Sequence, residues 1–338
     1  MCRLTSSIPR YGVSTDNRLY LNVRSHVMSE FAYKPSAWVP FDDVKIIERV
    51  RAIRREDIEK HSNPDFKIRV LPAEKIAHIF ITDIFSRIYR SDVEDTPVVF
   101  MFPNPNPAYW QVAHLINTLK VSCRNVWVFA LDEYADQDGN IAPETWEFGF
   151  FHSLLNNFYY AIDKELRPPK EQIIGPTNEN CKAYSKMIAD RGGADACYTG
   201  PGWTGHLAFV EPDAPEFKAA SLEEWLQMGS RIVTLSPFTL AQNSMHGSFG
   251  KSGDLAMVPP KAFTIGPRDV TGAKYRMDMS SITVHGTSTS WQRMITRLAA
   301  HGPVTPLVPT SIHQLLKTDY YISEENAKDI EPDWAKGY

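Results

Sequence analysis

The chain has 338 residues, of which 43% are hydrophobic, and carries a formal net charge of −4 with a sequence pI of about 6.2. This charge gives no electrostatic reason to expect a nucleic acid or an anionic membrane as partner. No apolar signal-like segment opens the chain, and no uncharged run approaches the ~20 residues that span a bilayer, so we expect a cytoplasmic protein. The four cysteines lack CxxC spacing, which indicates free thiols rather than a zinc site.

Residues 1–64 are expected to form an N-terminal extension. Residues 1–40 are irregular and polar. Residues 41–60 place an apolar side chain every third position, which predicts one amphipathic helix with Asp42 or Asp43 as its N-cap. The sequence HSNPD at residues 61–65 predicts a break, and we place the domain boundary after residue 64.

Residues 65–338 predict alternating strands and helices. Strands are expected at 67–71, 97–102, 125–130, 195–199, 231–235, 262–265, 280–285 and 319–322. Helices are expected at 72–89, at 107–120 and within 145–165. Because continuous apolar runs alternate with helical periodicity, we expect an α/β fold with a doubly wound, mainly parallel sheet flanked by helices. Ligands in such folds bind at the carboxyl ends of the strands.

A short acidic segment, Leu131–Tyr134, follows directly on the predicted strand that ends at Ala130. Asp132 is therefore expected at the carboxyl end of a strand, where a partly desolvated carboxylate can act as a base. Acidic residues after a strand also serve as turn or capping residues, so position alone leaves both interpretations open.

A glycine-rich segment, Gly200–Pro212, follows the predicted strand that ends at Thr199. Its glycines allow a tight turn and a close approach of backbone N–H groups to a ligand oxygen. His206, followed five residues later by Glu211, can open a sugar ring by moving a proton between the ring oxygen and the anomeric hydroxyl. Taken alone, a glycine-rich turn or a single histidine is more often structural.

Together the two segments resemble the glucosamine-6-phosphate deaminase/isomerase family. That family carries a DEY motif after one strand and a GxGxDGHIAFNEP-like motif after a later one, and this chain has Asp132–Tyr134 and Gly200–Pro212. Between them, Pro143–His152 is similar to the family's PESY..FMH helix start. Weaker likeness runs from Lys67 to about Ala327. The related 6-phosphogluconolactonases carry a GHTAS-type motif, and the AFVEP sequence here favours the deaminase branch.

The resemblance implies a Rossmann-like enzyme of carbohydrate metabolism, a homo-oligomer that needs no metal or organic cofactor and whose partner is a small-molecule sugar. It implies that Asp132 moves a proton between C1 and C2 of the open sugar, that His206 opens the ring and that Glu211 assists the histidine. Ammonia leaves and a ketose phosphate forms. The expected substrate-binding residues are Asn104, Asn106, Glu133, Gly202, Thr204, Gly205, Thr287 and Thr289.

The chain departs from the family pattern at Thr204, where the family has an aspartate before Gly-His. That carboxylate orients the histidine and favours its charged form. Threonine can accept a hydrogen bond but carries no charge, so we expect slower or differently organised ring opening.

The phosphate ligands of the family are also replaced. Its first loop is glycine-rich, whereas residues 102–110 here read FPNPNPAYW, and the prolines remove backbone donors. Its phosphate arginine and lysine align with Met245 and near Thr289. Two alternatives stay open. Hydroxyls of 286–290 before a helix starting near Trp291 could hold an anion, or Asn104, Asn106, Tyr109 and Trp110 could bind a neutral sugar.

The sequence thus predicts a deaminase/isomerase-like enzyme that acts on an amino sugar, phosphorylated or not. The other interpretations are an isomerase of a non-phosphorylated sugar and a non-catalytic sugar-binding or regulatory protein on the same scaffold. The presence of Asp132, His206 and Glu211 together favours the enzyme, while Thr204 and the replaced phosphate ligands favour the binding protein.

Overall fold

The computed structural model describes residues 33–282 and 290–334, and the chain divides into two compact units, Met1–Val39 and Pro40–Tyr338. Of the first unit only residues 33–39 are described, and they contain a turn without helix or strand. The second unit holds all the elements below. The division of the chain at residue 64 stays a prediction.

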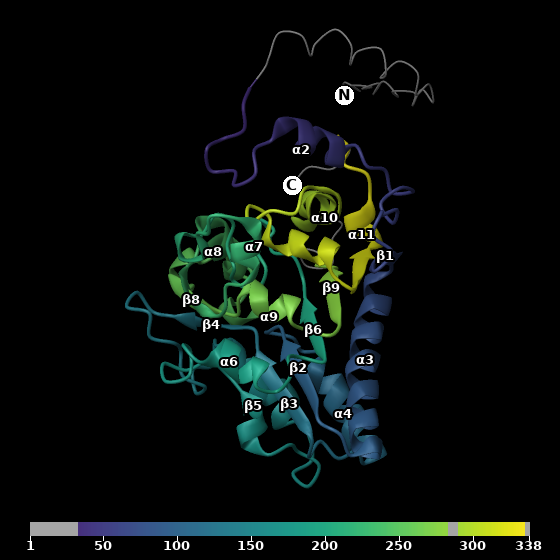
Figure 1. Ribbon diagram of the computed structural model, residues 1–338, viewed down its shortest axis with the longest axis vertical. Coiled ribbons are helices and arrows are strands. Elements are labelled where there is room, and N and C mark those ends of the chain that lie inside the picture. Colours follow the sequence, from purple (N-terminus) through teal and green to yellow (C-terminus); the bar gives the residue numbers. More distant parts are fainter. Residues whose placement is uncertain (1–32, 283–289, 335–338) are drawn as a thin grey trace, which may run out of the picture. The chain divides into compact units, whose positions relative to one another are not determined.

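A seven-stranded parallel sheet forms the centre of the second unit (Figure 1). Its strand order is β1-β10-β9-β6-β2-β3-β5, and every neighbouring pair runs parallel. The strands are β1 (Phe66–Leu71), β2 (Val98–Phe102), β3 (Val126–Ala130), β5 (Ile173–Ile174), β6 (Ala196–Thr199), β9 (Arg276–Ser280) and β10 (Thr318–Ser323). The predicted α/β fold with a mainly parallel sheet is confirmed.

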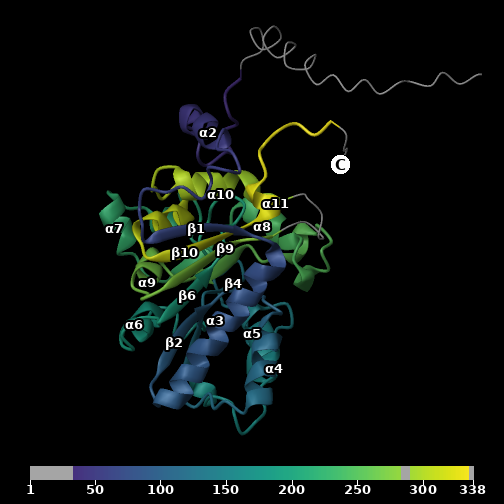
Figure 2. The ribbon, with the colours of Figure 1, turned by 90° about the vertical axis from the view of Figure 1, so that its right-hand side faces the viewer.

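Helices cover both faces of this sheet, as Figure 2 shows for α3 and α4 on one side and α6 and α9 on the other. The helices are α2 (Val44–Arg51), α3 (Ala73–Glu94), α4 (Tyr109–Leu119), α5 (Phe150–Leu154), α6 (Tyr184–Ala189), α7 (Leu222–Leu226), α8 (Pro237–Ser244), α9 (Pro267–Thr271), α10 (Gln292–His301) and α11 (Glu324–Ala327). Shorter turns are a π-helix at Leu155–Tyr159 and 3-10 helices at Lys170–Gln172, Pro215–Phe217, Gly247–Phe249, Leu255–Met257 and Pro309–Leu315.

Strand β2 shows why the central strands are apolar throughout. Phe100 and Phe102 enter the core beneath α3 and α4, whereas Val99 and Met101 enter the core on the opposite face. Since side chains alternate across a strand, a strand buried on both faces must be apolar at every position. The continuous apolar run from which this strand was predicted is a consequence of its burial on both faces.

A second sheet has three antiparallel strands in the order β4-β8-β7. It consists of β4 (Asp132–Ala135), β7 (Arg231–Thr234) and β8 (Lys261–Thr264). The last two were predicted as strands, but they pair here and not in the parallel sheet. Strand β4 begins two residues after β3 ends, so the acidic segment is itself a strand and its side chains alternate in direction.

Two predicted boundaries are corrected. Helix α2 is capped by Asp43, as expected, but ends at Arg51, because the amides from Ile53 onward that bond within this segment do so three residues back and form turns. Strand β9 ends at Ser280, where the predicted strand 280–285 begins, and residues 283–285 lie outside the described part of the chain. The sequence pattern did not predict a strand at Arg276–Ser280, because the polar residues Arg276 and Asp278, which are buried in the structure, stand at alternate positions and resemble an exposed face.

Candidate active site

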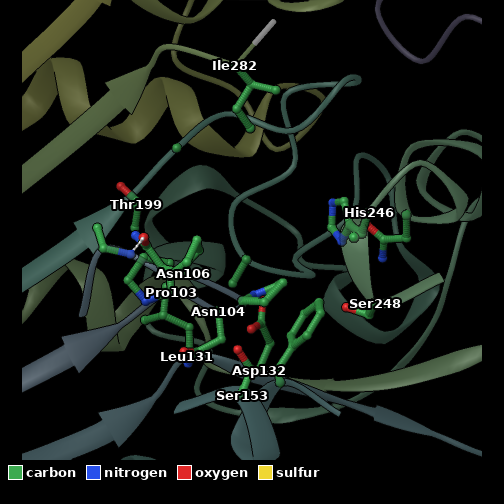
Figure 3. A pocket seen from close by; sticks show the side chains of 18 of the residues that line it. Pro103, Asn104, Asn106, Leu131, Asp132, Ser153, Thr199, His246, Ser248 and Ile282 are labelled. Carbon is green, nitrogen blue, oxygen red and sulfur yellow. Dashed lines mark hydrogen bonds between the residues drawn. The ribbon is translucent and has the colours of Figure 1, made fainter. Parts of the chain in front are cut away.

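A cavity of about 820 Å³ lies at the carboxyl edge of the parallel sheet (Figure 3). Two of its walls are the loops that follow neighbouring strands, residues 103–108 after β2 and Gly200–Gly202 after β6. Asp132 and residues of α5 form another side, and residues 242–251, at the end of α8 and beyond, complete it. The position is the one expected for ligands of a parallel α/β sheet.

Asp132 is the first residue of β4 and faces the cavity. It is buried, and its Oδ1 has no hydrogen-bond partner among the described residues. Burial first, and the neighbouring Glu133 carboxylate second, raise the pKa of Asp132 well above its ordinary value. A desolvated carboxyl group with a raised pKa and a free oxygen is suited to accept and return a proton.

Glu133, one residue on, faces the opposite way. Its carboxylate accepts hydrogen bonds from the backbone amides of Tyr134, Phe150 and Phe151 at 2.8, 3.0 and 2.7 Å. Burial raises its pKa to about 7, although these three amides oppose the shift. Glu133 does not line the cavity. It anchors the N-terminus of α5, and its predicted contact with substrate stays a prediction.

His206 lies on the cavity wall, buried against Gly202. A Cβ added to Gly202 would lie 1.9 Å from His206 Nε2, so only glycine lets the imidazole occupy this place. The Nδ1 atom of His206 lies 3.0 Å from Thr239 Oγ1 and 3.4 Å from Thr204 Oγ1. Burial lowers the pKa of His206, and the Glu211 carboxylate opposes the shift.

Glu211 lies behind the histidine and does not line the cavity. Its Oε2 is 3.8 Å from His206 Nδ1, beyond hydrogen-bond distance. Instead, it accepts hydrogen bonds from Ser236 N at 2.9 Å and from Ser236 Oγ at 3.2 Å. Ser236 Oγ is also 3.3 Å from Thr239 Oγ1. The carboxylate therefore reaches His206 through two hydroxyl groups, at the position where Ser236 caps α8.

The loop after β2 brings both predicted asparagines to the cavity. Asn104 donates to Phe102 O at 3.2 Å and leaves its buried Oδ1 without a partner among the described residues. Asn106 accepts a hydrogen bond from Ala108 N at 3.0 Å, at the entrance of α4. Neither Tyr109 nor Trp110 lines the cavity: Tyr109 is fully buried and donates to Pro103 O, and Trp110 is exposed.

The other predicted substrate-binding residues differ in their position relative to the cavity. Gly202 lines the cavity, whereas Thr204 and Gly205 do not. Thr287 and Thr289 lie outside the described residues.

The structure also brings to the cavity residues that the sequence did not suggest, namely His152, Ser153, Asn156, Asn157, Gln242, Asn243, His246, Ser248 and Lys251. His246 is held neutral, since burial and the nearby His206 lower its pKa to about 4, and its Nδ1 has no partner among the described residues. Lys251 is exposed, and no carboxylate of the described part of the chain pairs with it. It stands six residues after Met245, too far for a residue-by-residue alignment with the family to identify it.

Within the described ranges, no group of three or more His, Cys, Asp or Glu side chains could hold a metal ion, and no helix is long and apolar enough to cross a membrane.

No protein-family model matches the chain. Curated relatives are nevertheless similar over most of it. A glucosamine-6-phosphate deaminase of Caenorhabditis elegans is 26% identical over 262 residues, 75% of this chain and 88% of the relative. One of Mannheimia succiniciproducens is 29% identical over 272 residues, 77% of this chain and 91% of the relative.

Solved structures show the same fold. A monomeric glucosamine-6-phosphate deaminase superposes with a TM-score of 0.60 at 20% identity, covering 77% of this chain and 98% of that one. A 6-phosphogluconolactonase from Leishmania guyanensis gives a TM-score of 0.54 at 11% identity, covering 78% and 98%. The chain is thus similar in sequence to glucosamine-6-phosphate deaminases over about three quarters of its length, and it shares its fold with a deaminase of this kind and with a 6-phosphogluconolactonase.

Proposed function

We propose that the protein is an amino-sugar deaminase/isomerase. The observation that carries the proposal is the pair formed by Asp132 and His206, a carboxyl group with a raised pKa and an imidazole with a lowered one, which line the same cavity. Two buried titratable groups whose pKa values are shifted by their surroundings and that line one cavity are typical of proton-transfer sites.

In the proposed reaction His206 takes the anomeric hydroxyl proton and returns a proton to the ring oxygen, which gives the open-chain aldehyde. Asp132 then removes the proton from C2 and delivers one to C1. The product is a ketimine, which water hydrolyses to a ketose with release of ammonia. Glu211 supports His206 through Ser236 and Thr239.

The substrate of this proposal carries an anionic group, because Lys251 supplies a positive charge to the cavity wall. Backbone donors of the proline-containing loop cannot replace it, since Pro103, Pro105 and Pro107 have no N–H. The amides of Asn104 and Gln242 suit the sugar hydroxyls, which both donate and accept hydrogen bonds. A phosphorylated amino sugar, such as glucosamine 6-phosphate, meets both requirements.

The central test is the release of ammonia and ketose from glucosamine 6-phosphate by the purified protein. The variant Asp132→Asn should lower kcat by about 10²–10⁴-fold, because it removes the proton-transferring group, while substrate still protects it in a thermal-shift assay. Wild-type protein that binds the substrate without turnover would support the non-catalytic binding protein instead. Unchanged turnover in Asp132→Asn would remove this residue from the mechanism.

The charge of the substrate is tested at Lys251. Lys251→Gln should raise KM for glucosamine 6-phosphate by about tenfold and leave KM for glucosamine unchanged. Only the phosphorylated sugar carries a negative charge that the Lys251 ammonium group attracts. The wild-type KM should also rise with salt, and less so in the variant. Equal effects on both sugars would contradict the assignment.

The proposal includes a cytoplasmic homo-oligomer with a sugar as its small-molecule partner. Light scattering at several protein concentrations measures the mass and would reject the oligomer if the monomer mass, 38.4 kDa, persisted.

A further inference from the structure

A buried ionisable cluster lies below the glycine-rich loop and takes no part in the proposed chemistry. It consists of Thr199, the last residue of β6, Asp278 of β9 and His313 of the 3-10 helix Pro309–Leu315. The Asp278 Oδ2 atom accepts a hydrogen bond from Thr199 Oγ1 at 2.7 Å and lies 3.1 Å from His313 Nε2. Thr199 Oγ1 and His313 Nε2 are 3.1 Å apart, so each of the three side chains contacts the other two.

All three side chains are almost completely buried, Asp278 and His313 at 0% exposure and Thr199 at 2%. Polar side chains in such a place give up their hydration, and well-packed apolar residues would often stabilise a fold more. Asp278 Oδ1 and His313 Nδ1 also have no partner among the described residues. Stability is therefore a weak reason for this cluster, and its place in the fold suggests another.

The cluster lies where the glycine-rich loop begins. Thr199 and Asp278 are paired in register on neighbouring parallel strands, and Thr199 is followed directly by Gly200. A Cβ on Gly200 would lie 2.7 Å from Met279 O, so the loop leaves its strand in close contact with the end of β9. A shift at Thr199 or Asp278 would thus move the start of the loop.

The 3-10 helix Pro309–Leu315 holds the other end of the same loop. The backbone amide of Thr310 donates to Gly205 O at 2.9 Å, one residue before His206. Between the two ends, Gln292 Nε2 donates to Pro201 O at 2.8 Å. One short helix therefore contacts the start of the loop through His313 and its end through Thr310.

We propose that Thr199, Asp278 and His313 are positioning residues that fix the Gly200–His206 loop and so hold His206 against the cavity. Thr199 itself lines the cavity (Figure 3), so the cluster also joins the cavity wall to the buried Asp278 and His313. The catalytic consequence rests on the proposed function, whereas the effect on the loop does not.

Hydrogen exchange tests the proposal without relying on turnover. The amides of Gly202, Trp203 and Gly205 are bonded to His206 O, Gln242 Oε1 and Gly202 O, so their exchange reports the order of the loop. Thr199→Val removes the hydroxyl at nearly constant shape and should speed exchange of these amides by about tenfold. Thr199→Ser, which retains the hydroxyl, should exchange like the wild type.

Thr310→Val is the matched control. Its buried Oγ1 has no partner among the described residues, while its backbone amide keeps the bond to Gly205. This variant should leave exchange in the loop unchanged. Equal exchange in Thr199→Val and Thr310→Val would overturn the proposal. So would faster exchange in Thr199→Val that extends equally to β2, since that would be general destabilisation.

Asp278→Asn provides a second route if Thr199→Val does not fold. It replaces the carboxyl group that both partners contact and should speed exchange of the same three amides. With glucosamine 6-phosphate, both variants should lower kcat by about tenfold, because a misplaced His206 opens the ring more slowly. If the wild type shows no turnover, the proposed function fails, but the exchange comparison still decides whether the cluster positions the loop.

Discussion

The two loops that follow β2 and β6 start from neighbouring strands, yet they differ in how their backbone is held and in the side chains that they present. The loop at Gly200–His206 holds a titratable side chain in place through bonds to surrounding elements, among them Gln292 and Thr310. The loop at 103–108 is shaped by its three prolines, whose rings fix the backbone, and contains no titratable side chain.

The difference teaches how one cavity can combine a wall that fixes the proposed reaction centre with a wall that offers ligand contacts. Glycine is required at position 202, where the His206 ring touches the backbone, so the loop at Gly200–His206 tolerates little change. The loop at 103–108 instead presents the side chains of Asn104 and Asn106 to the cavity. We expect the loop at Gly200–His206 to govern turnover and the loop at 103–108 to govern affinity.

The largest effect is expected from Gly202→Ala. The new methyl group would overlap the His206 ring, since the ideal Cβ lies 1.9 Å from Nε2, and the imidazole must move. Because a displacement of about 1 Å can reduce catalysis by 10²-fold, kcat/KM should fall at least that far. Steady-state kinetics measures the loss, and circular dichroism verifies the fold. Near-normal turnover would mean that His206 does not act from this position.

A smaller effect, on binding alone, is expected from Asn104→Ala. The substitution removes a buried Oδ1 without a partner among the described residues but also the bond to Phe102 O, so Tm should change little. Loss of one sugar contact should weaken ligand affinity by about three- to tenfold at constant kcat. A lower kcat with normal affinity would contradict the expectation that the loop at 103–108 governs affinity and not turnover.

The smallest effect concerns acid stability. The folded-state pKa of His206 is lowered below its ordinary value by burial, so the neutral form contributes stability above pH ~6.5 that is lost as pH falls through the folded pKa. Unfolding measured from pH 7 to 5 should therefore show a steeper loss for the wild type than for His206→Gln. Asn104→Ala, on the loop without titratable groups, should follow the wild type.

The sequence predicted those parts of the molecule that depend on local pattern. Buried strands such as β2 and β3 are continuous apolar runs, and the two motifs follow strands that the pattern located. It did not predict β4, because four residues of mixed polarity pair with β8 only through tertiary structure. The same reason hid Ser236, Thr239 and Lys251, which reach the site from elements distant in sequence.

Adjacent carboxylates show the limit of motif-based assignment most clearly. Asp132 and Glu133 share one motif, yet strand alternation sends the first to the cavity and the second to the end of α5. A resemblance assigns both to one site. Only the direction of each side chain separates a candidate catalytic acid from a helix anchor.

Glu133 has a further consequence for redesign of the protein. Helix α5 and the turn after it carry His152, Ser153, Asn156 and Asn157 to the cavity, and Glu133 holds the start of that helix. A side chain outside the cavity lining thus ties the strand of Asp132 to the helix that carries these polar residues. Libraries aimed at new sugars should vary that wall and leave its buried anchor untouched.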